Sequence, residues 1–215
     1  YDYSDFVEGL RPKLNADGTM GFALQDGIFK KFVARARVNY ENAQGSTETL
    51  KKYIFIIDEI NRGEISKIFG ELFFSIDPGY RGRAGEISTQ YSNLHSDPDE
   101  KFYIPENLYI IGTMNDIDRS VDSFDFAMRR RFRFVELKAD ERLEMLASLE
   151  NEELKNEAIG RMGDLNKAIA GVEDLNENYQ IGAAYFLKLK TLSFDQLWTD
   201  YLQPLLQEYV RGMYD

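Results

Sequence analysis

Apolar residues form two kinds of pattern along this chain, unbroken runs and positions three or four residues apart, and these predict strands that alternate with helices. The runs YIFII (residues 53–57) and NLYIIGTM (107–114) are rich in β-branched and aromatic side chains, which is typical of strands buried on both faces of a parallel sheet. Apolar positions three and four residues apart predict one helix from Asp26 to Tyr40 and another over 65–76. The string Asp77-Pro78-Gly79 ends the second helix.

Less regular segments surround these elements. Residues 1–25 carry turn signals and one short apolar piece, and the Gly-, Ser- and Asp-rich residues 79–104 predict a hairpin and a loop. A helix is predicted over Ser120–Arg131 and a third, alternating strand over 131–137. Strands that alternate with helices predict an α/β fold with a mostly parallel sheet covered by helices.

The last third of the chain has a helical character. Residues 140–171 are strongly charged and place leucines on one side, while Tyr185–Leu187 predict a short strand or the start of a helix. Phe194–Tyr214 predict a final amphipathic helix, or a helix pair interrupted at Pro204. The predicted domains are an α/β core over 1–138 and a helical subdomain over 139–215.

Composition narrows the classes of protein to which this chain can belong. The 215 residues carry a formal net charge of −11, which makes a poor non-specific binder of nucleic acid because phosphate contacts need Lys and Arg. The sequence has no Cys, so disulfides and thiolate metal sites are excluded and a cytoplasmic setting fits. No apolar run reaches the roughly 18 residues of a membrane span. We therefore expect no membrane contact, and contact with DNA only through regions outside this chain.

Two adjacent carboxylates, Asp58 and Glu59, directly follow the first apolar run. Open α/β sheets bind ligands at the carboxyl edge of their strands, so this pair suits nucleotide hydrolysis, with one acid orienting a water on Mg²⁺ and the other polarising the attacking water. The second run ends at Asn115, whose amide can hold that water or the γ-phosphate. The structural alternative is that Asp58 caps the next helix and Asn115 belongs to a turn.

Three consecutive arginines, Arg129 to Arg131, end the helix predicted before the third strand. Positive charge at a helix C-terminus interacts favourably with the helix dipole, which is the structural explanation. The functional explanation is an arginine finger, a guanidinium offered to the γ-phosphate bound by a neighbouring subunit.

Three strings taken in order resemble the AAA+ domain of the McrB family: YIFIIDEINRGEISKIFGEL, NLYIIGTMNDIDRS and DFAMRRRF. This family comprises the GTP-hydrolysing motor subunits of methylation-dependent, 5-methylcytosine-specific restriction endonucleases. The later strings YQIGAAYFLKL and LWTDYLQPLLQEYV resemble the family's helical lid. The resemblance covers nearly the whole chain, and Met-Asn-x-x-Asp-Arg-Ser joined to the later Arg-Arg-Arg-Phe is its most specific element.

The resemblance implies a role for each polar residue at the strand ends. Asp58 is the Walker B acid that holds Mg²⁺ through water, and Glu59 is the catalytic glutamate. Asn115 takes the sensor 1 position, and Asp118 closes the family's Asn-Thr-Ala-Asp signature. The middle of that signature is Asp116-Ile117 here, so the nucleotide is expected to be GTP or ATP.

The resemblance also implies partners. Arg130 and Arg131 become the arginine-finger candidates, which requires a homo-oligomer, expected to be a hexameric ring. The family's ring drives a McrC-like nuclease subunit, and it reads DNA through a separate region.

One essential motif is absent from the sequence. A P-loop needs G-x-x-x-x-G-K-[ST], and no Gly in this chain is followed by Lys. The stretch GAAYF in the lid-like part also carries no arginine that could act as sensor 2. We therefore expect a fragment of a longer protein, truncated before the P-loop, that binds nucleotide weakly by itself, hydrolyses it negligibly and exposes apolar sheet surface.

Three alternatives remain open at this point. The chain is a non-catalytic module for ring assembly, or it belongs to another AAA+ motor of the MoxR or dynein type. In the third alternative, Asp58, Glu59 and Asp118 surround two metal ions in a metal-dependent hydrolase.

Overall fold

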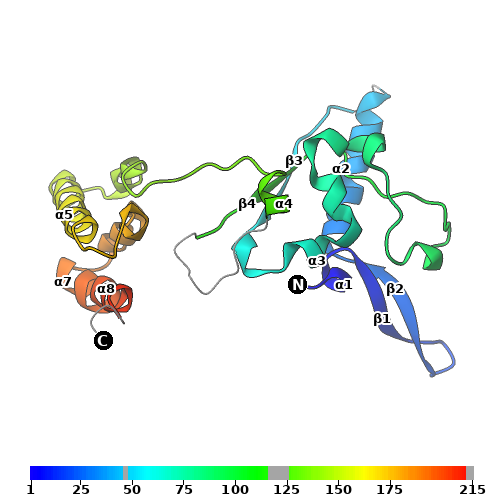
Figure 1. Ribbon diagram of the computed structural model, residues 1–215, viewed down its shortest axis with the longest axis horizontal. Coiled ribbons are helices and arrows are strands. Elements are labelled where there is room, and N and C mark those ends of the chain that lie inside the picture. The colour runs from blue at the N-terminus through cyan, green and yellow to red at the C-terminus, as the bar shows by residue number, and fades with distance from the viewer. Residues whose placement is uncertain (46–47, 116–125, 212–215) are drawn as a thin grey trace. The chain divides into compact units, whose positions relative to one another are not determined.

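The computed structural model describes residues 1–45, 48–115 and 126–211, which divide between two compact units (Figure 1). The first unit is Tyr1–Phe134 and the second is Val135–Asp215. Each unit has a hydrophobic core of its own. No helix in the described part of the chain is long and apolar enough to cross a membrane.

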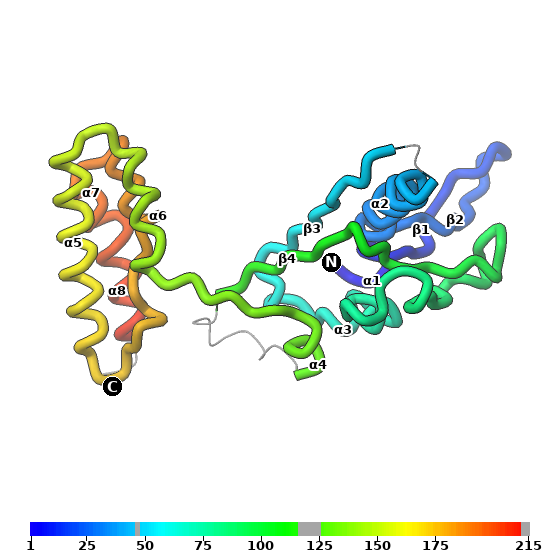
Figure 2. Tube along the Cα trace, turned by 90° about the horizontal axis from the view of Figure 1, so that it is seen from above, coloured from blue at the N-terminus to red at the C-terminus, as the bar shows by residue number. Residues whose placement is uncertain are grey.

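The first unit is built around two parallel strands and one long helix (Figure 2). Strand β3 (Tyr53–Ile57) pairs in parallel with β4 (Leu108–Gly112), which confirms both predicted strands. Helix α2 (Ile28–Gln44) confirms the predicted helix, and Phe29 on its buried face contacts Phe55 at 5.1 Å between ring centroids. The paired strands and the helices therefore give the expected α/β arrangement.

The prediction that these strands are buried on both faces is wrong for the described structure. Ile54 is 51% exposed and Ile56 is 64% exposed, whereas Phe55 between them packs into the core. Tyr109 and Ile111 on β4 are each 47% exposed. Alternate positions of a strand point to opposite faces, so one face of the pair packs against α2 and the other remains open.

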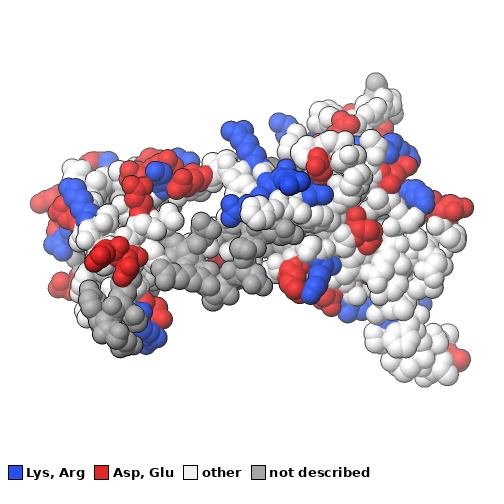
Figure 3. Space-filling model, in the orientation of Figure 1, with Lys and Arg blue, Asp and Glu red and all other residues white. Residues whose placement is uncertain are grey.

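A β-hairpin that the sequence reading did not predict occupies the N-terminal region. After helix α1 (Tyr3–Phe6), strand β1 (Glu8–Leu14) pairs antiparallel with β2 (Met20–Asp26). The register places apolar residues opposite one another on one face of the hairpin. Figure 3 shows few Lys, Arg, Asp or Glu side chains at the far end of the hairpin. The facing pairs are Leu10 with Leu24, Pro12 with Phe22, and Leu14 with Met20.

A buried carboxylate fixes the base of this hairpin. The Glu8 side chain is fully buried and accepts hydrogen bonds from the Lys30 ammonium, from His95 Nε2 at 2.7 Å and from the Tyr91 backbone N–H at 3.2 Å. Lys30 also pairs with Asp26 at 2.7 Å. The cluster therefore ties the hairpin to α2 and to the loop that follows residue 87.

The predicted helix over 65–76 is broken in two. Helix α3 (Ile65–Phe69) gives way to a 3-10 segment, Gly70–Ile76, and Gly70 adopts φ 53° and ψ −129°, a conformation that residues with a Cβ rarely adopt. A Cβ there would also lie 2.9 Å from the Tyr3 ring. The apolar stripe survives the break, because Phe69, Leu72 and Ile76 remain buried.

Residues 78–104 form short 3-10 turns instead of the predicted hairpin, with one isolated bridge between Ile87 and Phe102. Arg81 donates to the carbonyls of Ile76 at 3.2 Å and Leu108 at 3.4 Å, so it joins this segment to the start of β4. Burial lowers the pKa of Arg81 to about 10. The turns themselves are Pro78–Tyr80, Gly82–Gly85 and Ser92–Leu94.

The predicted helix over Ser120–Arg131 falls partly outside the described residues. Its described portion is the short helix α4 (Phe126–Arg129). The strand predicted over 131–137 is wrong, because these residues adopt no regular structure. A strand requires a neighbour for its backbone hydrogen bonds, and none of the described residues pairs with this segment.

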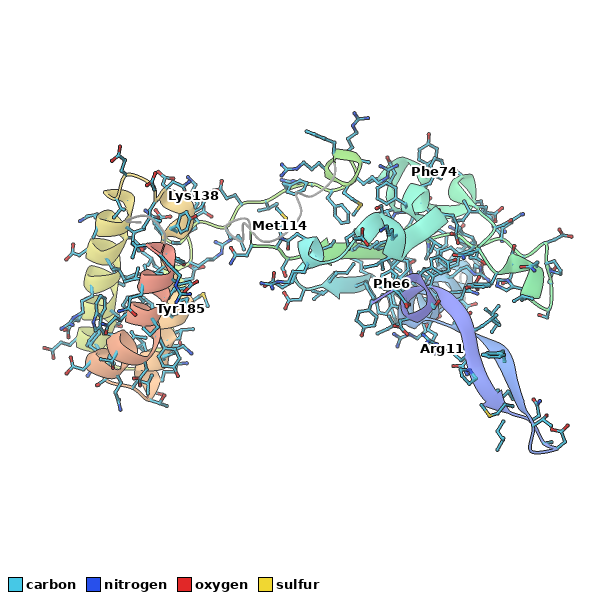
Figure 4. The ribbon with its side chains drawn as sticks, turned by 60° about the horizontal axis from the view of Figure 1, so that its bottom comes forward. Phe6, Arg11, Phe74, Met114, Lys138 and Tyr185 are labelled. Carbon is cyan, nitrogen blue, oxygen red and sulfur yellow. The ribbon has the colours of Figure 1, made fainter. Side chains whose placement is uncertain are left out.

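The second unit contains helices and turns, and no strand, in its described part. A 3-10 turn over Leu143–Ser148 precedes α5 (Glu152–Ala170), which is capped by Asn151. Helix α6 (Ala183–Phe186) settles the open prediction at residues 185–187 in favour of a helix. Tyr185, on this helix, is labelled in Figure 4. The Asn166 side chain exchanges two hydrogen bonds with the backbone of Ile181, at 3.0 and 2.7 Å.

The last helix continues through Pro204. Helix α7 (Phe194–Leu197) passes into a π-helical turn over Trp198–Leu202 and then into α8 (Gln203–Tyr209). Proline has no N–H to donate and crowds the preceding turn, and the wider π turn stands directly before it. The predicted interruption is therefore a local widening of one continuous helix.

Candidate functional site

The candidate site lies where β3 and β4 end side by side. Ile57 pairs with Gly112 in the parallel register, so Asp58 and Thr113 leave the sheet at the same edge. Gly112 allows this close approach, since a Cβ at that position would lie 2.8 Å from Ile60 Cδ1. The carboxyl ends of the two strands therefore present their polar side chains together, as the sequence predicts.

Asp58 is exposed and is held by the residue that directly follows β4. The Thr113 hydroxyl donates a hydrogen bond to Asp58 Oδ1. Among the described residues no group donates a hydrogen bond to Asp58 Oδ2, so this oxygen can accept one from a water. A single carboxylate of this kind fits Mg²⁺, which keeps several waters and takes one or two protein carboxylates together with substrate phosphates.

Glu59 has an unusual backbone conformation. Its φ of 53° and ψ of 48° lie in the left-handed region, and it is the only non-glycine residue with positive φ in the described ranges. Its backbone N–H donates to Thr113 Oγ1 at 3.2 Å, and its Oε2 pairs with Arg62 Nε at 3.1 Å. Such a conformation costs about 1–2 kcal/mol, so the hydrogen bonds of the turn must maintain it.

Asn115 lies close to the turn that follows β3. The Asn61 side chain donates from Nδ2 to the Asn115 carbonyl at 3.3 Å, while the Asn115 side chain is exposed. Within the described ranges, the buried Asn61 Oδ1 has no hydrogen-bond partner. Met114, between Thr113 and Asn115, packs against the core of the first unit and is labelled in Figure 4.

The remaining predicted residues are not assembled at this edge. Asp118 lies outside the described residues, as do Asp116 and Ile117. Arg130 is exposed in the turn after α4, and Lys and Arg side chains gather over this part of the first unit in Figure 3. Arg131 is half-buried instead, with its guanidinium 4.2 Å from the centroid of the Phe73 ring and Nη1 donating to the Ala127 carbonyl at 2.6 Å.

Sequence reasoning missed Thr113, Asn61 and Arg62 as members of the site. All three stand in the strings already singled out, directly after a strand or directly after the acid pair. A hydroxyl residue between the end of a strand and a candidate sensor asparagine is the signal that would have found Thr113. Asn61 and Arg62 are recognisable only once the turn after Glu59 is known.

The described residues offer little to a second metal ion or to phosphate groups. Within them, no three His, Cys, Asp or Glu side chains come together as potential metal ligands. Asp118, the third carboxylate of the two-metal alternative, lies outside them. A phosphate-binding Gly-Lys pair is absent from the whole sequence. The arrangement therefore suits one metal-bound water and one polarised water.

Comparison with known proteins gives two family matches. An AAA domain of the dynein-related subfamily matches residues 2–132. The α-helical lid domain of McrB matches residues 157–215. The matches separate a core from a lid along the chain and together leave only residues 1 and 133–156 uncovered.

Two relatives are restriction-enzyme components. The chain is 37% identical over 224 residues to the type IV methyl-directed restriction enzyme EcoKMcrB subunit of Escherichia coli K12, which covers 97% of this chain and 45% of that protein. It is 32% identical over 94 residues to the type II restriction enzyme BsuMI component YdiS of Bacillus subtilis 168, covering 41% of this chain and 27% of that protein. The chain thus spans less than half the length of either relative.

Proposed function

Because this chain belongs to the AAA family, in its dynein-related subfamily, and ends in a McrB-type lid, we propose that it is the nucleoside-triphosphatase motor module of a McrB-like restriction complex. The substrate is GTP or ATP, and the motor works in the cytoplasm. The observation that carries the proposal is the junction of the strand ends, where Thr113 joins Asp58 to the backbone of Glu59.

Each residue at the junction has one task in this proposal. Asp58 would hold the Mg²⁺ ion through a water, and the ion would supply charge neutralisation to the phosphates. Glu59 accepts a hydrogen bond from the attacking water and polarises it, and the exposed Asn115 amide orients that water or the γ-phosphate. In the structure Glu59 Oε2 pairs with Arg62, which leaves Oε1 as the oxygen of this carboxylate that would accept from the water.

The phosphates are held by residues outside this sequence, since the chain contains no Gly-Lys pair. The arginine finger comes from a neighbouring copy in a homo-oligomeric ring, which we propose to be hexameric. Arg130 is the better placed of the two candidates because it is exposed, whereas Arg131 stacks on Phe73 of its own chain.

The other partners follow from the relatives. Both relatives are named as components of restriction enzymes, which supports a partner nuclease subunit of the McrC type for this protein. DNA is read by regions outside the chain, in keeping with a net charge of −11. A remodelling motor of the dynein-related kind is the second candidate, and the core match to that subfamily favours it.

Substituting the catalytic acid tests the proposal in the full-length protein that carries this sequence. Glu59→Gln keeps the shape of the side chain and removes its charge, so hydrolysis of GTP or ATP should fall by about 100-fold or more. Nucleotide binding, measured by equilibrium titration, should remain. The chain alone should hydrolyse negligibly.

Glu157→Gln is the matched control, because Glu157 pairs with Arg161 at the surface of α5 in the second unit. It should leave the hydrolysis rate unchanged. Full activity in Glu59→Gln would contradict the motor, and nucleotide binding with no hydrolysis by the wild-type protein would favour the ring-assembly module.

A further inference from the structure

Thr113 bonds to four consecutive residues of the opposite strand end. Its backbone N–H donates to the Ile57 carbonyl at 3.0 Å, and its carbonyl accepts from the Ile60 N–H at 2.9 Å. Its hydroxyl donates to Asp58 Oδ1 and accepts from the Glu59 N–H at 3.2 Å. One side chain thus contacts both acids of the candidate site.

The backbone and side-chain bonds of Thr113 have different requirements. Any non-proline residue at this position can provide the N–H and carbonyl bonds to Ile57 and Ile60, which extend the parallel ladder. The Thr113 hydroxyl donates to the Asp58 carboxylate and accepts from the Glu59 amide through one atom, because a hydroxyl carries one donor and two acceptor lone pairs. The hydroxyl is therefore the specific feature of this position.

The Thr113 hydroxyl bonds to a residue with an unfavourable backbone conformation. Glu59 adopts left-handed backbone angles, and the direction in which its side chain leaves the turn depends on them. Its pairing with Arg62 involves two largely exposed side chains and contributes little by itself. The bond from the Glu59 N–H to Thr113 Oγ1 acts directly on the backbone that carries the acid.

We propose that Thr113 is a positioning residue of the hydrolytic site, whose hydroxyl holds the Asp58 carboxylate and the Glu59 backbone in one fixed arrangement. The inference rests on the proposed function. With Oδ1 occupied by Thr113, Oδ2 is the Asp58 oxygen that would accept a hydrogen bond from a metal-bound water, and the left-handed backbone of Glu59 sets the direction of its side chain. The absence of a side chain at Gly112 lets Ile60 approach and keeps the two strand ends within bonding distance.

Two substitutions in the full-length protein separate the hydroxyl from the shape of the side chain. Thr113→Val keeps the branched shape and removes the hydroxyl, whereas Thr113→Ser keeps the hydroxyl. Loss of a group that orients a metal-site carboxylate typically costs about 10–100-fold in activity or metal affinity. Thr113→Val should therefore lower kcat and raise the Mg²⁺ concentration for half-maximal rate by about 10-fold or more, with KM for the nucleotide within about twofold.

Thr113→Ser should restore most of the rate and the wild-type Mg²⁺ dependence, which a merely structural role would not produce. Thermal unfolding followed by circular dichroism identifies any variant that fails to fold. Wild-type kcat and Mg²⁺ dependence in Thr113→Val would overturn the proposal. So would an equal defect in the Ser variant, because the shape of the side chain would then matter and not its hydroxyl.

Amide hydrogen exchange in the 215-residue chain gives a readout that needs no activity. The Glu59 amide should exchange at least about 10-fold faster in Thr113→Val than in wild type, because a bond to the Thr113 hydroxyl protects it. Thr113→Ser should retain the protection, and equal exchange in all three proteins would overturn the proposal. An inactive wild-type protein with the expected exchange pattern would overturn the proposed function and leave Thr113 as the residue that fixes the turn.

Discussion

Arg130 and Arg131 are adjacent in the sequence and have different surroundings. Arg131 stacks on Phe73 and donates to the Ala127 carbonyl, so Arg131→Ala should lower the free energy of unfolding by about 1 kcal/mol, as measured by urea denaturation. Arg130→Ala should change it by less than about 0.5 kcal/mol, since Arg130 is exposed. In the proposed ring, Arg130→Ala should reduce hydrolysis without this loss of stability. The reverse order of stabilities would contradict the placement of the two side chains.

The buried Glu8 makes stability depend on pH. Burial raises the pKa of the Glu8 carboxyl, but hydrogen bonds from Lys30, Thr89 and His95 outweigh burial and hold this pKa below the ordinary value of 4.5. A lowered pKa in the folded state means that ionised Glu8 stabilises the fold above pH 4.5, and that this contribution is lost as pH falls through the lowered pKa.

Glu8→Gln should therefore cost about 2 kcal/mol of unfolding free energy at pH 7, because it removes the charge from these hydrogen bonds. Urea denaturation of the wild type and the variant between pH 7 and pH 3 measures the difference. The difference should shrink below pH 4.5. A difference that stays constant or grows on acidification would show that the carboxylate is not held in its ionised form.

At the scale of elements, the break between α3 and the following 3-10 segment depends on Gly70. Gly70→Ala places a Cβ in a backbone region that such residues rarely adopt and brings it against the Tyr3 ring. Strain of this kind costs about 1–3 kcal/mol, which thermal or urea unfolding should detect. Gly160→Ala in α5 is the control, because a Cβ there meets open space and alanine favours a helix. Equal stability in the Gly70 variant would mean that the break can relax.

The elements that sequence predicts well here are those with strong local patterns. The strand over 53–57 is an unbroken apolar run, and the helix that becomes α2 has apolar residues three and four positions apart; both patterns are local to the segment. The hairpin of β1 and β2 was missed, although Leu10, Pro12 and Leu14 alternate along β1. Neither segment alone shows which residues of the two strands face one another. The strand expected over 131–137 has the alternation but no paired neighbour among the described residues, which no local pattern reveals.

The candidate site also combines features that a local sequence pattern reveals with features that depend on contacts between distant segments. The placement of Asp58, Glu59 and Asn115 at one sheet edge could be predicted, because residue type and position after an apolar run are both visible in the sequence. The Thr113 hydroxyl bonds were not found, because they join residues 54 and 55 positions apart. The left-handed angles of Glu59 were not expected either, since glutamate has no local preference for them.

At the scale of the whole molecule, the open face of β3 and β4 predicts association. Ile54, Ile56, Tyr109 and Ile111 expose apolar surface on adjacent strands, and such patches promote contact with other molecules. Sedimentation velocity should show that the chain self-associates as its concentration rises. A double variant, Ile54→Thr with Ile56→Thr, should remain folded and shift toward the monomer.

Met145→Thr is the control for this experiment, since Met145 is an exposed apolar residue of the second unit and lies outside the open face. It should leave the association unchanged. A wild-type chain that stays monomeric at every concentration would show that the open face does not drive association.

The position of Trp198 in the π turn has a spectroscopic consequence. It is the only tryptophan in the sequence, and it lies in the second unit at the start of that turn. Indole emission therefore monitors the lid-matching part of the chain alone, whereas the first unit, with its stacked Phe6 and Phe29, has no such chromophore. A fluorescence transition and a far-ultraviolet circular dichroism transition that fail to coincide would accordingly report two cores that melt separately.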